Sequence, residues 1–178
     1  ITSDGVFSMD GAIAPLDRLT ALARQYGALV HIDECHATGF LGPTGRGTAE
    51  FHGVMDQIDV YTSTLGKALG GGLGGFTTGR REIIDLLRQR SRPYLFSNSL
   101  PPPIAAASLK VFDLLMRADD LRVRLMDSAR YFRERMTSAG FRIPQGIHPI
   151  VPVIVGDTAL ALAMGRALLE RGVYVSGF

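Results

Sequence analysis

The chain has 178 residues, of which 46% are hydrophobic and 20% are charged, an ordinary composition for a globular protein. The formal net charge of +2 is too small to favour nucleic acid or an anionic membrane, and no apolar run is long enough to span a bilayer. The single cysteine, Cys35, excludes an internal disulfide framework and is typical of a reducing compartment.

The first half of the chain alternates helix and strand patterns. Residues 15–26 carry apolar side chains at helical spacing, and the apolar run 28–32, which ends at Asp33, predicts a buried strand. A loop rich in glycine and proline follows over 36–47, and 58–62 predicts a second strand. This order is typical of an α/β domain with a mostly parallel sheet.

The next segment begins with glycines and ends with an extended stretch. Residues 66–75 are glycine-rich, and a short strand is expected over 75–78. Apolar spacing predicts a helix over 81–90, and prolines favour extended backbone over 93–98.

The pattern changes near residue 119. Helices are expected over 103–116, 119–139 and 159–171, and short strands over 150–155 and 173–175. We therefore predict a large α/β domain over residues 1–113, followed by a linking helix and part of a smaller C-terminal α+β domain over 114–178. Both ends of the chain have the pattern of an α/β unit cut short, so we expect an internal fragment of a longer protein.

Two residues at predicted strand ends form a candidate site. Asp33 lies at the carboxyl end of one strand and Lys67 just beyond the end of another, where open parallel sheets bind their ligands. Of the 19 basic residues only Lys67 and Lys110 are lysines. An acid and an amine in these positions suit pyridoxal 5′-phosphate (PLP), because lysine forms a Schiff base with its aldehyde and a carboxylate keeps its pyridine nitrogen protonated.

Nearby residues could complete such a site, and each also has a simpler interpretation. His36 could reach the cofactor ring from the turn after Asp33, and the hydroxyl of Thr64 could bind a phosphate. On the other hand, an aspartate after a strand is often a turn residue, a loop histidine is often structural, and a lone lysine is usually a solvated charge. Cys35 is expected to be a small buried residue. Only the combination favours PLP chemistry.

Two rival glycine motifs are not met. Gly70, Gly72 and Gly75 match the dinucleotide-binding spacing, but the residues that follow predict a strand where that motif requires a helix. Ala68 after Lys67 breaks the pattern of a nucleotide phosphate-binding loop. The four histidines are too scattered to suggest a metal site.

Three short stretches resemble a known family. They are DECHATG at residues 33–39, GRG at 45–47 and STLGKALGG at 63–71. They resemble the α-oxoamine synthases, PLP-dependent acyltransferases with the aspartate aminotransferase fold (fold type I), which join an amino acid to an acyl-CoA. Within that family, SDGVFSMDG at 3–11 and RSRPYLFSNSLPP at 90–102 resemble the members that use glycine and acetyl-CoA.

The resemblance implies roles for the residues that match. Lys67 would hold PLP as a Schiff base and later move a proton at the substrate α-carbon, Asp33 would bind the pyridine nitrogen, and Thr64 the phosphate. The residues that stack on the ring and grip the substrate carboxylate would lie outside residues 1–178.

The resemblance also implies an active site shared by two subunits. Ser8 and His36 would lie near the phenolic oxygen of PLP and the substrate, and His36 would be catalytic together with the lysine. Ser97 and Asn98 would reach the PLP phosphate of the other subunit in a homodimer.

The expected reaction interconverts 2-amino-3-oxobutanoate plus CoA with glycine plus acetyl-CoA, in threonine degradation. Two other members of the family stay open as alternatives: 8-amino-7-oxononanoate synthase, which uses alanine and pimeloyl-CoA, and 5-aminolevulinate synthase, which uses glycine and succinyl-CoA. A non-catalytic dimer partner is a third alternative, although such subunits typically lack the lysine. The expected compartment is the cytoplasm, with the mitochondrial matrix as the alternative.

Overall fold

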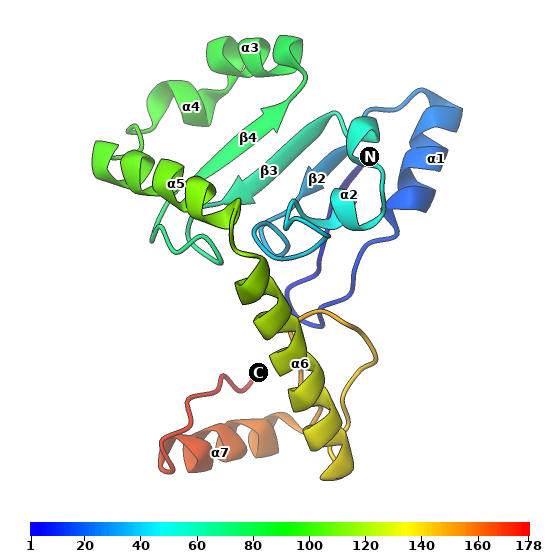
Figure 1. The fold of residues 1–178 in the computed structure, drawn as a ribbon, viewed down its shortest axis with the longest axis vertical. Coiled ribbons are helices and arrows are strands. Elements are labelled where there is room, and N and C mark those ends of the chain that lie inside the picture. Colours follow the sequence, from blue (N-terminus) through cyan, green and yellow to red (C-terminus); the bar gives the residue numbers. More distant parts are fainter.

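A four-stranded sheet forms the centre of the N-terminal part of the molecule. In the computed structural model, which describes residues 1–178, the strand order is β1 (Thr2–Asp4), β2 (His31–Asp33), β3 (Val60–Thr64) and β4 (Gly75–Gly79) (Figure 1). β1, β2 and β3 are parallel, and β4 pairs antiparallel with β3. The expectation of an α/β fold with a mostly parallel sheet is therefore confirmed.

Helix α1 (Leu16–Tyr26) connects β1 to β2 and buries one face of the sheet. Gly27 ends this helix in the left-handed conformation at φ 61°, which glycine adopts without steric cost. The short helix α2 (Thr48–Phe51) and a 3-10 turn, η1 (Met55–Gln57), connect β2 to β3. The main apolar core lies between these elements and the sheet; its buried members are Ala14, Leu16, Ala23, Val30, Ile32, Ala49, Val54 and Ile58.

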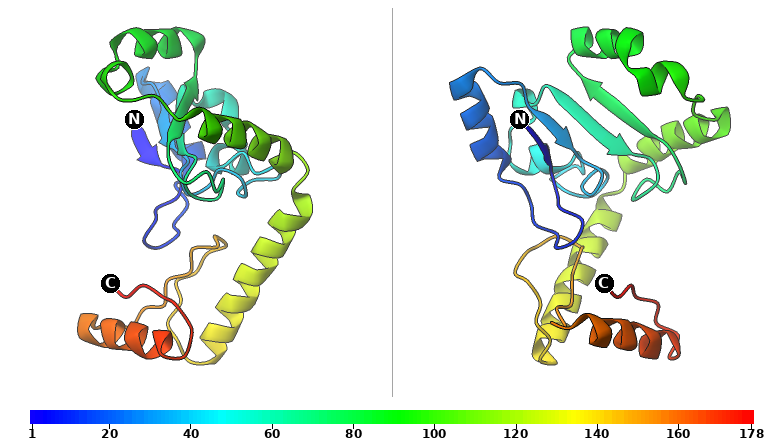
Figure 2. Two further views of the ribbon diagram at one scale, coloured as in Figure 1. Left: turned by 90° about the vertical axis from the view of Figure 1, so that its left-hand side faces the viewer. Right: turned by 180° about the vertical axis from the view of Figure 1, so that it is seen from behind.

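Three helices follow the outer strand. They are α3 (Arg81–Arg90), α4 (Arg92–Phe96) and α5 (Pro102–Leu115), and they lie on the β4 side of the sheet (Figure 2). The prediction that residues 93–98 are extended was wrong for the first part of that stretch, which forms α4. Pro93 stands in the first turn of α4, where the missing amide hydrogen costs no helical hydrogen bond.

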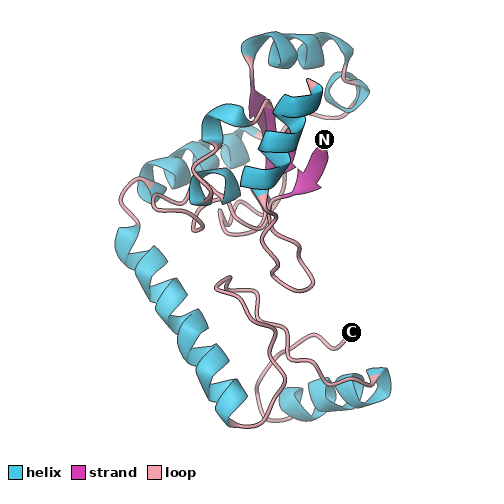
Figure 3. Ribbon diagram, turned by 90° about the vertical axis from the view of Figure 1, so that its right-hand side faces the viewer, coloured by secondary structure: helices cyan, strands magenta, loops and turns pink.

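Helix α6 (Asp119–Ser138) carries the chain away from the sheet, and α7 (Thr158–Leu169) lies beyond its far end (Figure 3). The strands expected over 150–155 and 173–175 were wrong. Ile154 makes only an isolated bridge with Arg142, because no neighbouring strand is there to complete a ladder. The assignment of 114–178 to a second domain stays a prediction. None of the helices combines the length and apolarity needed to cross a membrane.

The segment between α6 and α7 returns to the sheet. Ile150 packs against a second buried cluster formed by Val6, Ala37 and Leu41. The close approach also involves the turn at Gly11, where a β-carbon would lie 2.7 Å from the Ile150 carbonyl oxygen. The segment around Ile150 therefore contacts the N-terminal part directly, although Ile150 lies more than 100 residues after Ala37 and Leu41 in the sequence.

A buried carboxylate fixes the turn after β2. The side chain of Glu34 accepts hydrogen bonds from the backbone amides of Thr48 (2.9 Å) and Ala49 (3.1 Å), at the start of α2. Burial raises the pKa of Glu34, and these two bonds partly offset that effect. A β-carbon at Gly5 or Gly47 would lie 2.7 Å from the carboxyl group, so both positions require glycine.

We expect Glu34→Ala to lower the free energy of unfolding by about 2–4 kcal/mol, because two buried amides would lose their acceptors. Chemical denaturation of the full-length protein measures the effect. Glu82→Ala is the matched control, since Glu82 is exposed in the first turn of α3. A loss for Glu34→Ala no larger than that of the control would contradict the role given to the buried carboxylate.

Candidate active site

The candidate residues gather at the carboxyl ends of the parallel strands. The register places Asp4, Asp33 and Thr62 side by side on β1, β2 and β3. Lys67 lies in the loop after β3, close enough for its positive charge to lower the pKa of both Asp33 and His36. The sheet register and the loop after β3 thus bring together Asp33, His36 and Lys67, which are up to 34 positions apart in the sequence.

The Asp33 carboxylate is held by its neighbours in an ionised form. One oxygen accepts the Cys35 backbone N–H (2.8 Å) and the other accepts the Thr62 hydroxyl (3.0 Å). Burial by itself would raise the pKa of Asp33, but the bonds from Cys35 and Thr62 and the charge of Lys67 together hold it below its usual value. The group is therefore negative at neutral pH.

A histidine supports this arrangement from the same strand. Since the Thr62 hydroxyl donates to Asp33, it must accept the 3.0 Å hydrogen bond from His31 Nε2. His31 therefore carries its proton on Nε2, and a chain of hydrogen bonds runs from His31 through Thr62 to Asp33. The sequence analysis did not single out His31 or Thr62. Their positions were a usable signal, because His31 lies two residues before Asp33, on the same face of the strand, and Thr62 is the last residue of the next predicted strand.

The side chain of Lys67 is exposed and makes no hydrogen bond or ion pair within the chain. Its loop is ordered by the hydroxyl of Thr64, which accepts the Gly66 N–H (3.1 Å) and donates to the Gly74 carbonyl (3.2 Å). A β-carbon at Gly71 would lie 2.9 Å from the Leu65 carbonyl oxygen. The loop thus needs its glycine there, and it presents a free amine next to an ionised carboxylate.

The role of Thr64 in binding the phosphate stays a prediction. Its hydroxyl hydrogen is already donated to Gly74, so a bound phosphate would compete for it. The Gly66 amide, which points at the same hydroxyl, would be released together with it. Thr64 is therefore seen here as a residue that shapes the loop.

His36 lies in the turn after β2 and is half-buried. Burial, followed by the charge of Lys67, lowers the pKa of its imidazole, so the ring is neutral at pH 7. Its backbone carbonyl accepts a 2.8 Å hydrogen bond from Nε2 of His148. No local pattern predicts this contact, because the two histidines are 112 positions apart.

Ser8, Ser97 and Asn98 are exposed and are not joined to this cluster by side-chain hydrogen bonds. Ser8 is exposed in the turn closed by the Phe7 N–H to Ala12 carbonyl bond (2.9 Å). Ser97 and Asn98 are exposed immediately after α4. No side-chain hydrogen bond joins any of the three to Asp33, His36 or Lys67, so their roles stay predictions.

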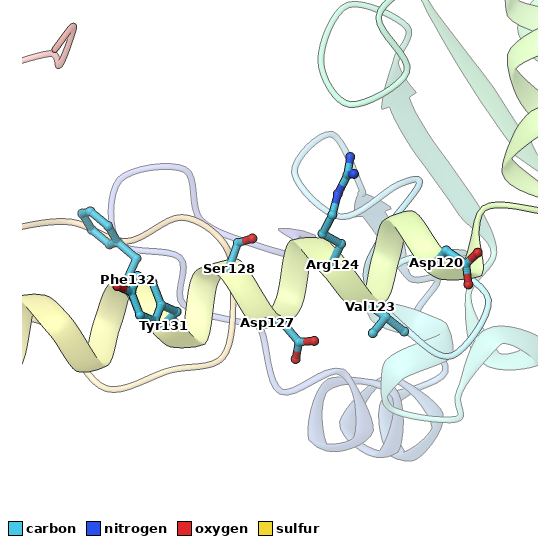
Figure 4. A pocket seen from close by; sticks show the side chains of 7 residues that line it. All are labelled: Asp120, Val123, Arg124, Asp127, Ser128, Tyr131 and Phe132. Carbon is cyan, nitrogen blue, oxygen red and sulfur yellow. The ribbon is translucent and has the colours of Figure 1, made fainter. Parts of the chain in front are cut away.

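Two hollows of the surface lie away from these residues. One, of about 600 Å³, runs along α6 (Figure 4) and is lined by Asp120, Val123, Arg124, Asp127, Ser128, Tyr131 and Phe132. A second, of about 530 Å³, is lined by residues near the end of α5. Neither hollow includes a candidate residue. The position of the candidate site is therefore inferred from the carboxyl ends of the strands and from the charged groups around Asp33.

Comparison with known proteins gives a consistent picture. The family model described as "Aminotransferase class I and II" matches residues 1–178. The chain is 55% identical to mouse (Mus musculus) mitochondrial 2-amino-3-ketobutyrate coenzyme A ligase over 178 residues, 100% of this chain and 43% of the relative. It is 44% identical to 8-amino-7-oxononanoate synthase of Thermoanaerobacter pseudethanolicus, over 99% of this chain and 45% of that protein.

A solved structure has the same fold. Serine palmitoyltransferase from S. paucimobilis, a lysine-to-alanine variant with PLP and myriocin bound, superimposes with a TM-score of 0.92 at 37% identity. The match covers 98% of this chain and 46% of that one. The chain therefore spans less than half the length of each of these three proteins.

The thiol of Cys35 offers a direct test of the electrostatics. Burial, then hydrogen bonding to Asp33 and the charge of that carboxylate, raise the pKa of Cys35 to about 11 from an ordinary 9.0. We expect alkylation of the cofactor-free protein at pH 8 to be slower than that of the denatured chain by on the order of a hundredfold, because the thiolate is the reactive form.

The pH dependence separates this effect from restricted access. Asp33→Asn should move the midpoint of the alkylation rate to lower pH, since the substitution removes the negative charge beside the thiol. Limited access alone would slow the reaction equally at every pH. An unchanged midpoint in the variant would contradict the electrostatic interpretation. The chain has one cysteine, so the label reports on a single site.

Proposed function

Because the chain belongs to the aminotransferase class I and II family, we propose that it forms part of the PLP site of an acyltransferase. The proposed reaction is that of glycine C-acetyltransferase, also named 2-amino-3-ketobutyrate CoA ligase: glycine and acetyl-CoA are interconverted with 2-amino-3-oxobutanoate and CoA, in the direction of threonine degradation. The observation that carries the proposal is the free amine of Lys67 beside the ionised carboxylate of Asp33. The resemblance expected from the sequence is confirmed by the relatives.

The residues at the strand ends fit the cofactor. Asp33 is ionised and has its carboxylate hydrogen bonds from Cys35 and Thr62 in place, so it would hold a protonated pyridine nitrogen with little rearrangement. Lys67 has no competing partner and would hold the cofactor covalently through its amine. When bound, PLP supplies an electron sink that stabilises negative charge at the substrate α-carbon.

Each residue then has a task of its own. Asp33 keeps its negative charge beside the ring nitrogen. The amine of Lys67 takes the proton from the substrate α-carbon and later returns it. His36, neutral at pH 7 and near both groups, would contact the ring and the substrate from the turn after β2. Thr64 keeps the lysine loop in shape and could take the phosphate by releasing Gly74.

The second subunit of a homodimer completes the proposed site. The side chains of Ser97 and Asn98 are exposed and make no hydrogen bond within the chain, which suits contact with the PLP phosphate of a partner subunit. Ser8 is exposed on a turn near the strand ends and would lie close to the phenolic oxygen of PLP. Glycine, acetyl-CoA and CoA are the proposed small-molecule partners.

A second candidate function is 8-amino-7-oxononanoate synthesis, favoured by the relative that is 44% identical. The higher identity to the ligase, 55%, supports the glycine reaction over this one. A non-catalytic dimer partner is less well supported, because Lys67, Asp33 and His36 are all present. For the compartment we propose the cytoplasm, or the mitochondrial matrix as in the name of the mouse relative; the free thiol of Cys35 suits either.

Replacing the lysine tests the cofactor site. In the full-length protein, Lys67→Ala should abolish the visible absorption band of bound PLP and lower turnover by at least about a thousandfold, because the covalent anchor and the acid–base group are lost together. Lys110→Ala is the matched control, since Lys110 is the other lysine and is exposed on α5. A Lys67→Ala variant with a normal band and normal turnover would refute the assignment.

A panel of thioesters tests the acyl donor. With glycine as acceptor, we expect the full-length protein to turn over acetyl-CoA faster than succinyl-CoA, and to be inactive with alanine and pimeloyl-CoA. CoA release measured with a thiol reagent gives the rates. Activity restricted to pimeloyl-CoA or succinyl-CoA would replace the proposed function by one of the alternatives.

A further inference from the structure

His148 is a buried histidine that sequence reasoning left without a role. It is 0% exposed and comes from the segment between α6 and α7. Its Nε2 lies 2.8 Å from the carbonyl oxygen of His36, and its Nδ1 lies 3.0 Å from the backbone nitrogen of Ile150. The ring of Phe40 packs against it at a centroid distance of 5.3 Å. Both ring nitrogens are therefore used.

These contacts fix the tautomer. Nδ1 accepts the Ile150 N–H, so it carries no proton, and Nε2–H donates to the His36 carbonyl. Burial lowers the pKa of His148, the hydrogen bond to the His36 carbonyl partly offsets this effect, and the positive charge of Arg133 lowers the pKa further. The ring is thus a neutral, directional donor at pH 7.

An arginine on α6 holds the segment that carries this histidine. The guanidinium of Arg133 donates to the carbonyl oxygens of Pro144 (2.8 Å), His148 (2.7 Å) and Ile150 (3.0 Å). On the other side, the turn at Gly11 approaches Ile150 so closely that no β-carbon fits. His148 is therefore presented to His36 from a segment that is fixed on two sides.

The turn that contains His36 is held by its own hydrogen bonds and by the contact with His148. The amides of Ala37 and Thr38 both donate to the Glu34 carbonyl, and the Cys35 amide donates to Asp33. These bonds close the turn around its start. The carbonyl of His36 itself accepts a hydrogen bond from the distant side chain of His148, and it accepts none from the residues of the turn.

We propose that His148 is a positioning residue: by anchoring the backbone of His36, it sets the orientation of the His36 imidazole beside Asp33 and Lys67. This inference rests on the proposed function, because it takes His36 to act in that site. A neutral donor on a braced segment is suited to the task, since small displacements of an acting group reduce turnover about a hundredfold.

Two variants separate the two hydrogen bonds of the ring. In His148→Gln the amide nitrogen can reach the position of Nε2 and donate to the His36 carbonyl. In His148→Asn an acceptor remains near Nδ1 for the Ile150 amide, but the side chain is too short to reach His36. The matched control is His52→Asn, because His52 is a partly buried histidine away from the candidate site, and its Nδ1 lies 3.6 Å from the Asp17 carboxylate on α1.

Turnover and backbone exchange are measured on the same proteins. In the full-length holoenzyme we expect His148→Asn to lower kcat by about ten- to a hundredfold with little change in KM for acetyl-CoA, and His148→Gln to restore most of it. In the cofactor-free protein, His148→Asn should speed hydrogen exchange at the amides of Ala37 and Thr38. His52→Asn should alter neither quantity.

The proposal requires that kcat and exchange change together. A His148→Asn variant with faster exchange and wild-type kcat, or with lower kcat and wild-type exchange, would overturn it. If His148→Asn does not fold, Arg133→Met, which removes the hydrogen bonds that hold the segment of His148, is tested under the same rule. Failure of the proposed function has a different signature: the wild-type protein would not turn over glycine and acetyl-CoA, while exchange in the cofactor-free variants would still test the anchor.

Discussion

The turn that follows β2 is the constraint on which the structure depends. Its residues each point to a different part of the molecule. The Glu34 carboxylate holds the start of α2, Asp33 is aligned with the site, and Ala37 enters the second apolar cluster. Because one short stretch serves the core and the site together, the geometry of the site is set by the same bonds that stabilise the fold.

Charge organises what this turn positions. An aspartate, a histidine and a lysine converge where three parallel strands end, and they act on each other's pKa values: the lysine lowers those of the other two. The aspartate is ionised, the histidine is neutral, and the amine has no partner in the chain. This division of protonation states is what acid–base chemistry at a carbon atom needs at neutral pH.

Local patterns predicted much of this, and long-range contacts limited the rest. The bounds of α1, α3, α5 and α6 and the position of Lys67 followed from apolar spacing, glycines and a recognised motif. The strand expected over 150–155 failed because strand formation depends on a pairing partner, which no local pattern reveals. The contact of His148 with His36 was missed for the same reason, whereas α4 was missed because proline tolerates a first helical turn.

The path of the chain through α6 has a mechanical consequence. The helix leads away from the sheet, and residues 140–150 lead back toward it. Arg133 binds this returning stretch to α6, and His148 binds it to the turn after β2 (Figure 1). The helix, the returning stretch and the turn after β2 thus form three connected sides, like a triangle. A tilt of α6 against the sheet would therefore have to break one of these bonds. Beyond Ile150, the Ile154 N–H donates to the Arg142 carbonyl (2.9 Å), so the chain stays tied to the returning stretch up to residue 154. The residues from α6 to Ile154 are thus held to one another and to the turn after β2, and α7 begins only after them, at Thr158.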